Sequence, residues 1–235
     1  KKGEGNYSLV LDSPAAIARM MNSGELDLGM IPSIEYLANK NHYKLLPPLV
    51  IASKGPVDTV LLIAKKELDE IRTVALDERS LSSATLVKLL FQDQFDPGVQ
   101  FKTISPDPVT QMQIFDAVLI IGDKALEARH RLNSYRVYDL SEEWYQETGK
   151  PFVHAVLAAR KEMKLPESLS LVFNEALARA PATISKISKT HSARFMLDAA
   201  QCEDYLKNKI LYHLNPETRS GLDHFRTLWL QKAAS

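Results

Sequence analysis

Short apolar runs that end in polar residues recur through the first two thirds of the chain. They span residues 7–11, 26–31, 58–64, 73–77, 99–104, 115–121 and 152–159. Runs of four to eight residues rich in Leu, Val and Ile are too short for an ordinary helix and are typical of buried strands. The pattern therefore predicts a strand at each of these places.

Helical patterns separate several of these runs and replace them after Pro166. We expect helices at residues 15–21, 36–43, 84–92, 167–180, 193–206 and 216–232, with a short helical turn at 142–147 and a polar stretch before residue 192. Strands that alternate with helices, followed by helices alone, predict an α/β protein with two lobes and a cleft between them. We place residues 1–69 and 151–235 in the first lobe and residues 70–150 in the second.

The first helix has the clearest boundaries. Ser13 followed by Pro14 is a typical N-cap with proline in the first turn, and Gly24 is suited to the position after the last turn. Strand 7–11, this helix and strand 26–31 would form a βαβ unit, which requires a parallel pair of strands.

Composition excludes several classes of function. The 235 residues are 45% hydrophobic, and 29 basic residues balance 29 acidic ones, with no block of like charge. This balance predicts no binding to nucleic acid or to an anionic membrane surface. The single cysteine, Cys202, excludes an internal disulfide and fits a reducing compartment, and no apolar run approaches the ~20 residues of a membrane span. We expect a cytoplasmic protein.

The run that ends at Pro32 and Ser33 has the strongest signal for a binding site. Proline ends a strand ladder because it has no N–H to donate. Ser33 would then present a hydroxyl at the carboxyl end of a strand, where open α/β sheets bind ligands. The alternative is that Pro32 and Ser33 only begin the next helix.

A serine-rich turn at Ser80, Ser82 and Ser83 offers a second candidate, just before the helix predicted at residues 84–92. Helix N-termini present unpaired N–H groups and a partial positive charge, so hydroxyls there favour a carboxylate or phosphate. Asp77 could cap or orient this turn. The alternative is ordinary capping by Ser82 or Ser83, which uses the same groups.

Three more polar residues could carry chemistry. Thr59 precedes an apolar strand, Asp123 follows the most apolar strand of the chain, and His154 lies inside an apolar run. Asp123 could instead cap the next helix, and His154 could be a core histidine. The histidines have no partners at metal spacing, and the chain has no phosphate loop, dinucleotide fingerprint or Gly-x-Ser-x-Gly motif, so the sequence predicts no metal site and no cofactor.

The chain resembles the chorismate dehydratase family of the futalosine route to menaquinone, and the matching motifs extend over nearly its whole length. They are residues 23–27 leading into Ile31-Pro32-Ser33-Ile34-Glu35-Tyr36; residues 59–62; Val74-Ala75-Leu76-Asp77 with the three serines; residues 119–123; Asp139-Leu140, Trp144, Thr148-Gly149 and residues 151–153; and Tyr212, Leu214, Gly221-Leu222 and Phe225. Each motif is weak alone, but their order and spacing together are specific.

The resemblance implies a type II periplasmic-binding-protein fold used as an enzyme. The enzyme would be a lyase that dehydrates chorismate to 3-[(1-carboxyvinyl)oxy]benzoate without a metal or organic cofactor. By position, Ser33, Ser82 and Ser83 would hold substrate carboxylates, Thr59 would line the cleft, and Asp123 would lie at the opposing wall. The resemblance leaves the general base open, with Asp123 and His154 as candidates beside a carboxylate of the substrate itself.

The sequence departs from the family pattern at several points. The family usually opens with a strand ending in Ser-Tyr-Leu-Asn, and this sequence begins after that point. Thr59 stands where serine is common, Leu157 where tryptophan is frequent, and His154 where phenylalanine is frequent. Two other functions stay open: a non-catalytic solute-binding protein or sensor for small carboxylates, and the related 1,4-dihydroxy-6-naphthoate synthase. The sequence does not predict the oligomeric state.

Overall fold

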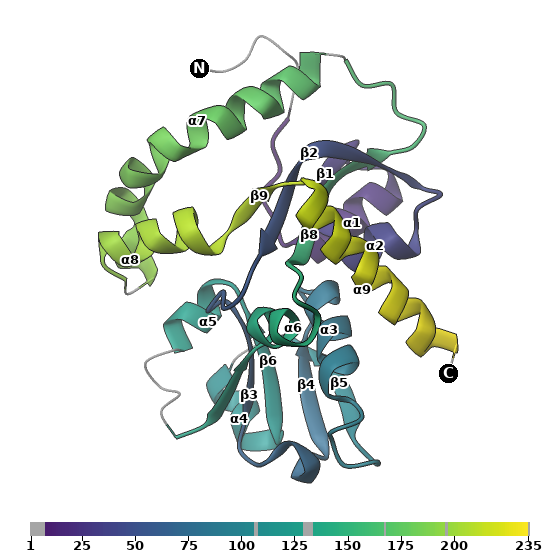
Figure 1. The fold of residues 1–235 in the computed structure, drawn as a ribbon, viewed down its shortest axis with the longest axis vertical. Helices are drawn as coiled ribbons and strands as arrows, with labels where there is room; N and C mark the ends of the chain where they lie inside the picture. Colours follow the sequence, from purple (N-terminus) through teal and green to yellow (C-terminus); the bar gives the residue numbers. More distant parts are fainter. Residues whose placement is uncertain (1–7, 106–107, 129–133, 167, 196, 235) are drawn as a thin grey trace.

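The computed structural model describes residues 8–105, 108–128, 134–166, 168–195 and 197–234 and arranges them around two β-sheets (Figure 1). A four-stranded sheet lies in the upper part of Figure 1 and a five-stranded sheet in the lower part. We call the four-stranded sheet with helices α1, α2 and α9 the first lobe, and the five-stranded sheet with helices α3 to α6 the second lobe.

The first-lobe sheet has the order β1-β8-β2-β9, and all neighbouring strands are antiparallel. Its strands are β1 (Leu28–Pro32), β8 (Phe152–Arg160), β2 (Tyr43–Ser53) and β9 (Leu211–His213). The prediction that residues 152–159 return to the first lobe as a strand is therefore confirmed. Gly29 allows β1 to pack closely on α1, because a Cβ at this position would lie 2.4 Å from Ile17 Cγ2.

The second-lobe sheet has the order β5-β4-β6-β3-β7. Its strands are β3 (Val60–Ala64), β4 (Thr73–Asp77), β5 (Gln100–Ile104), β6 (Ala117–Ile121) and β7 (Arg136–Asp139). Strand β4 is parallel to β5 and β6, while β3 is antiparallel to β6 and β7. Every residue of β3 is buried, which explains its continuous apolar sequence.

The helices cover both sheets and extend to one side. They are α1 (Pro14–Ser23), α2 (Ser33–Ala38), α3 (Leu81–Phe91), α4 (Pro108–Ile114), α5 (Asp123–Ala128), α6 (Leu140–Thr148), α7 (Ser168–His191), α8 (Ala199–Asp204) and α9 (Pro216–Ala234). Short 3₁₀ turns lie at Leu68–Glu70 and Ser192–Phe195, and a π-helical turn lies at Tyr205–Lys209. In Figure 1, α7 runs along the outside of the first lobe, and α9 passes beside α2 toward α3.

The chain passes between the sheets at residues 54–59 and again at residues 149–151. The predicted boundary after residue 69 falls between β3 and β4, which share one sheet, so the first change of sheet comes before residue 60. The second predicted boundary, at residue 151, coincides with the return to β8. We keep the division into two discontinuous lobes as a proposal, with this shift of its first boundary.

The βαβ unit predicted at the N-terminus is wrong among the described residues. Tyr7 lies outside them, and residues 8–13 form no strand, with Leu9 83% and Leu11 86% exposed. Strand β1 has antiparallel β8 as its partner, and no second partner within the described residues. An apolar run becomes a strand only where another strand satisfies its backbone groups. The helix of the unit is confirmed, with Ser13 as its N-cap and Gly24 at φ 84° after its last turn.

Several predicted helix boundaries need correction. The helix expected at 193–206 is divided into a 3₁₀ turn, α8 and the start of a π-helical turn, and the helix expected at 36–43 ends at Ala38. Helix α2 begins at Ser33 instead of residue 36, directly after Pro32. Helix α3 begins at Leu81 instead of residue 84, because Ser80 has extended backbone geometry and its side chain accepts a hydrogen bond from the N–H of Ser83. Helix α7 continues through Pro181 and the polar stretch to His191, since buried Leu177, Ile184 and Ser188 keep one face of it packed.

An aromatic cluster fills the region where the chain returns to the first lobe. Trp144 and Phe152 have ring centroids 5.5 Å apart, and Phe225 of α9 lies 6.0 Å from Trp144 and 5.0 Å from Phe152. The Trp144 indole N–H donates to the carbonyl of Pro151 at 3.3 Å. Helix α9 approaches closely at Gly221, where a Cβ would lie 1.9 Å from the Pro151 carbonyl oxygen. This packing fixes the second lobe-to-lobe connection.

Candidate active site

The two lobes meet through two serines. Ser33 is the first residue of α2, and Ser82 lies in the first turn of α3. Their hydroxyl oxygens are 3.1 Å apart, and the backbone N–H of Ile34 donates to Ser82 Oγ at 3.3 Å. The two hydroxyls, each expected to hold a substrate carboxylate, therefore lie together across the lobes.

Both serines are completely enclosed where they meet. Ser33 is 0% and Ser82 1% exposed. Each hydroxyl therefore has a partner from the opposite lobe instead of solvent. A ligand can reach these groups only when the lobes move apart, which is the motion expected of a two-lobed protein whose lobes close over a substrate.

The rest of the serine turn is used for capping. Ser80 is the N-cap of α3, and its hydroxyl donates to Ser83 Oγ at 2.7 Å while accepting from the Ser83 N–H at 3.3 Å. The alternative, that Ser82 or Ser83 caps the helix, is therefore wrong: Ser80 is the cap, because the helix begins earlier than expected. Ser82 is left to face Ser33.

Asp77 forms an ion pair that the sequence did not reveal. Its carboxylate is 1% exposed and accepts from Arg79 Nε at 3.0 Å and from Arg79 Nη2 at 2.6 Å. These hydrogen bonds raise the pKa of Arg79, so the guanidinium stays charged. Asp77 orients the turn through this arginine and through its own backbone carbonyl, which accepts from the Ser80 N–H at 3.1 Å.

Arg79 also faces a cavity that lies between the lobes. The cavity has a volume of about 620 Å³, and its lining includes Arg79 and Glu78 from the second lobe with Asp12, Ser13 and Arg19 from the start of the first. The side chain of Arg79 is 32% exposed there. The guanidinium groups of Arg19 and Arg79 thus line one cavity from opposite lobes, together with the carboxylates of Asp12 and Glu78.

Thr59 lies in the first passage between the lobes and contacts a residue far away in sequence. Its hydroxyl lies 3.1 Å from the phenol oxygen of Tyr205, in the π-helical turn. Burial raises the pKa of Tyr205, which keeps the phenol protonated. The carbonyl of Thr59 accepts from the Gly122 N–H at 2.7 Å, which joins this passage to the end of β6.

Asp123 is the first residue of α5, and its side chain is exposed. It is near enough to raise the pKa of both Arg79 and Tyr205 by its charge. Asp123 therefore adds negative charge near both Arg79 and Tyr205. Tyr205, which contacts Thr59, and Arg79, which pairs with Asp77, are the two residues here that the sequence did not identify.

His154 belongs to a different polar cluster, at the junction of the lobes. Its Nε2 lies 2.7 Å from Ser53 Oγ, and Ser53 Oγ lies 2.5 Å from Ser141 Oγ of α6. Burial lowers the pKa of His154 to about 4, so the imidazole is neutral at physiological pH. Its Nδ1 is buried and has no hydrogen-bond partner within the described part of the chain.

Asp139 connects the same junction through backbone groups. Its Oδ2 accepts from the N–H of Val57 at 2.8 Å and of Asp58 at 2.6 Å, and its Oδ1 accepts from Ser141 and Glu142. Burial raises the pKa of this carboxyl, while the four backbone donors act in the opposite direction. Asp139 therefore caps α6 and holds the first passage between the lobes.

The described residues contain no group of three or more His, Cys, Asp and Glu side chains that could hold a metal ion. In the same part of the chain, no helix has the length and apolar character needed to cross a membrane. The chemistry available at this site is hydrogen bonding from serine, threonine and tyrosine hydroxyls and the positive charge of arginine.

Comparison with known proteins identifies relatives over nearly the whole chain. A family model described as menaquinone biosynthesis matches residues 2–230. A chorismate dehydratase from Thermus thermophilus is 30% identical over 227 residues, which cover 90% of this chain and 83% of that protein.

Solved structures show the same fold at lower identity. A protein from Archaeoglobus fulgidus matches with a TM-score of 0.74 and 18% identity, over 96% of this chain and 86% of that one. The periplasmic aliphatic sulphonate binding protein SsuA from Escherichia coli matches with a TM-score of 0.59 and 17% identity, over 95% and 76% of the two chains. The predicted two-lobed periplasmic-binding-protein fold is confirmed.

Proposed function

Because this chain belongs to the menaquinone biosynthesis family, we propose that it is a lyase that dehydrates chorismate to 3-[(1-carboxyvinyl)oxy]benzoate. The observation that carries the proposal is the 30% identity to a chorismate dehydratase over 90% of the chain. A biosynthetic role on chorismate also favours the cytoplasm as its location.

The reaction requires little chemistry from side chains. A ring hydrogen leaves as a proton, the neighbouring C–O bond breaks to release hydroxide, and the two combine as water while the ring becomes aromatic. The ring carboxylate acidifies the departing hydrogen through conjugation. The protein has to hold two carboxylates, align the breaking bonds and exclude bulk water.

Ser33 and Ser82 suit the task of binding one carboxylate. Their hydroxyls come from opposite lobes and already meet at 3.1 Å, so a carboxylate placed between them would accept a hydrogen bond from each lobe. Such a ligand would favour lobe closure, because it replaces the contact between serines with two charge-assisted hydrogen bonds. Burial of the pair supports exclusion of water from the closed site.

Arg79 and Arg19 suit the second carboxylate. They line the same cavity from opposite lobes, and an arginine fork can form two parallel hydrogen bonds with a carboxylate. Arg79 already uses two of its donors on Asp77, so Arg19 has the larger unused capacity. Thr59 and Tyr205 would then face the body of the substrate, with Asp123 on the opposing wall.

The proton acceptor is open among three groups. Asp123 has an exposed carboxylate beside the site. His154 is neutral, and its Nε2 is occupied by Ser53, which leaves only the enclosed Nδ1. A carboxylate of chorismate could also take the proton. An Asp123→Asn variant that retains turnover would leave the substrate carboxylate as the favoured acceptor.

The test of the proposal is incubation of the protein with chorismate and detection of the aromatic ether by absorbance and mass. We expect a product lighter than chorismate by one water, which forms without added metal or cofactor. The competing function is that of a solute-binding protein or sensor, since the sulphonate-binding proteins share the fold. Tight binding of chorismate without product would establish that second function and refute the first.

A further inference from the structure

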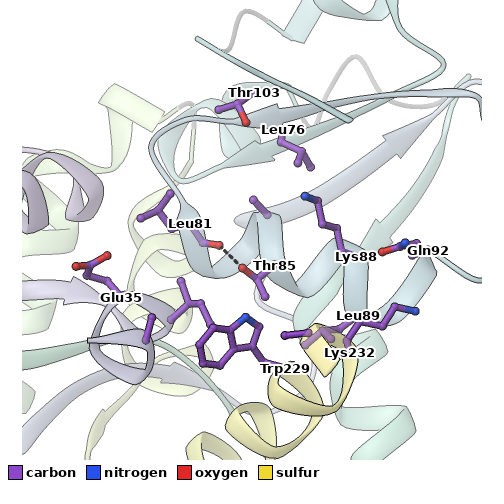
Figure 2. Close-up of a pocket in the computed structure, with 14 residues that line it drawn as sticks. Glu35, Leu76, Leu81, Thr85, Lys88, Leu89, Gln92, Thr103, Trp229 and Lys232 are labelled. Atoms are coloured by element: carbon purple, nitrogen blue, oxygen red, sulfur yellow. Dashed lines mark hydrogen bonds between the residues drawn. The ribbon is translucent and has the colours of Figure 1, made fainter. Parts of the chain in front are cut away.

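A groove lies beside the contact between Ser33 and Ser82. Its volume is about 500 Å³, and α2 and α9 line it from the first lobe while α3 lines it from the second (Figure 2). This volume lies within the range of small-molecule sites. Ile34 and Leu81, which line it, are the sequence neighbours of Ser33 and Ser82.

One part of the groove is apolar. In Figure 2 the indole of Trp229 projects from α9 toward the face of α3 that carries Leu81 and Thr85, with Leu89 one turn further along. Leu81 is 39% exposed, and Trp229 is partly exposed. An indole face beside leucine side chains is suited to a flat apolar or aromatic group.

The opposite part is positively charged. Lys88 lies on the same face of α3, and its ammonium is 5.1 Å from the centre of the Phe101 ring, with no carboxylate paired to it within the described residues. Gln92 follows one turn later and also lines the groove. Lys232 contributes a second ammonium, which is held by Asp93 at 2.7 and 2.8 Å.

The acidic group of the groove is engaged elsewhere. Glu35 Oε1 accepts hydrogen bonds from Asn22, Asn39 and the Tyr43 hydroxyl, at 2.9 to 3.1 Å. A carboxylate ligand would therefore avoid the Glu35 end and place its charge at Lys88 and Gln92. The apolar part of the same ligand would then reach Trp229 and Leu81.

We propose that this groove binds a small aromatic carboxylate at a site separate from the one between Ser33 and Ser82. Because both lobes line the groove, a bound ligand contacts α3 on one side and α2 and α9 on the other. The ligand thereby stabilises the arrangement in which these helices lie close together, and it acts on lobe closure without occupying the substrate position.

The test is calorimetric titration of the whole protein with 2-naphthoate as the probe, repeated with uncharged 2-naphthamide. We expect one site for the naphthoate and at least fivefold weaker binding of the amide. Lys88→Glu should weaken naphthoate binding by tenfold or more, and Trp229→Leu by at least threefold. Lys186→Glu, an exposed lysine on α7, is the matched control and should bind as the original protein does.

Binding is measured without turnover, so the result stands apart from the dehydratase proposal. Saturating chorismate should leave the number of naphthoate sites at one, because the two ligands bind at separate sites. The proposal is overturned if the original protein does not bind 2-naphthoate. It is also overturned if Lys88→Glu and Trp229→Leu both retain the original affinity, or if saturating chorismate abolishes naphthoate binding.

Discussion

Ser82 has two partners on the opposite lobe, the hydroxyl of Ser33 and the N–H of Ile34. Ser82→Ala removes both and leaves a buried N–H unsatisfied, which costs about 1–3 kcal/mol. We therefore expect the free energy of unfolding to fall by this amount in urea denaturation. Ser134→Ala, at an exposed serine, is the control and should change it by less than about 0.5 kcal/mol. Equal stability of the two variants would contradict the contact.

His154 should make the protein less stable in mild acid. Its pKa is lowered from 6.5 to about 4 by burial, so the unfolded chain binds the proton more readily than the folded one. The penalty is absent above pH 6.5 and grows as the pH falls toward 4. Between pH 7.5 and 5.0 we expect a loss of roughly 1–2 kcal/mol in the free energy of unfolding from this residue.

Urea denaturation of His154→Gln at the two pH values measures that contribution. The variant should lose less stability on acidification than the original protein, by the same 1–2 kcal/mol. His191→Gln, at an exposed histidine, should keep the original pH dependence. An unchanged pH dependence in His154→Gln would show that the imidazole is not held neutral by burial.

Arg19 should contribute to substrate binding and little to stability. Its side chain is exposed on α1 and lines the cavity between the lobes with Arg79. Arg19→Gln should raise the KM for chorismate by about tenfold, as expected for the loss of one charge-assisted interaction. The melting temperature should stay within about 2 °C. An unchanged KM would place the second substrate carboxylate elsewhere.

Some residues of the site could be predicted from the sequence and others could not. Ser33 and Asp123 were found because each closely follows an apolar strand, which is where sheets bind ligands. Ser82 was found because it lies in a serine-rich turn just before a predicted helix. Tyr205 was missed because it joins Thr59 from 146 residues away, in a helical region without any local signal. Arg79 could have been identified from the sequence, since it lies two residues after an aspartate at the end of a strand.

Among the helices, α9 requires a glycine at position 221, because a larger residue there would clash with the chain it packs against. A Cβ at Gly221 would lie 1.9 Å from the backbone oxygen of Pro151. Glycine to alanine in a helix is normally stabilising by about 0.5–1 kcal/mol, whereas overpacking costs about 1–3 kcal/mol. We expect Gly221→Ala to be destabilising, with a fall in melting temperature of several degrees.

Whether the melting temperature of Gly221→Ala falls or rises tests this packing. Thr227→Ala, at an exposed position of the same helix, should alter the melting temperature by no more than about 2 °C. A higher melting temperature for Gly221→Ala would mean that α9 does not pack against the second connection between the lobes.

Strands β1, β3, β4, β5, β6 and β8 were predictable as elements because buried strands read as continuous apolar runs, whereas β2, β7 and β9 lack such a run and were not predicted. The failure at residues 8–11 has the same physical basis, since an apolar run specifies a strand only together with a partner. Helix α7 was divided in the prediction because Pro181 and a polar stretch interrupt its pattern. The structure keeps it whole through packing of Leu177 and Ile184, which a local pattern cannot foresee.

In the whole molecule, two passages of chain connect two sheets; buried polar groups hold the first, and the aromatic cluster around Trp144 holds the second. Asp139 binds the first passage through the N–H groups of Val57 and Asp58, and Ser53 contacts Ser141 and His154 at the junction. The two-lobed architecture could be predicted from the alternation of strands and helices along the chain and from the family resemblance. The polar contacts of Asp139 and Ser141 could not, because they join residues more than 80 positions apart.

In the proposed reaction, Ser33 and Ser82 act together, from opposite lobes, on chorismate. The most direct measurement is kcat/KM for chorismate in Ser33→Ala, Ser82→Ala and the double variant, with melting temperatures to confirm folding. We expect each single change to reduce kcat/KM by about tenfold or more, and the double variant to lose little beyond either one, because the two hydroxyls bind one carboxylate. Full activity in the double variant, or no dehydration of chorismate by the original protein, would contradict the account.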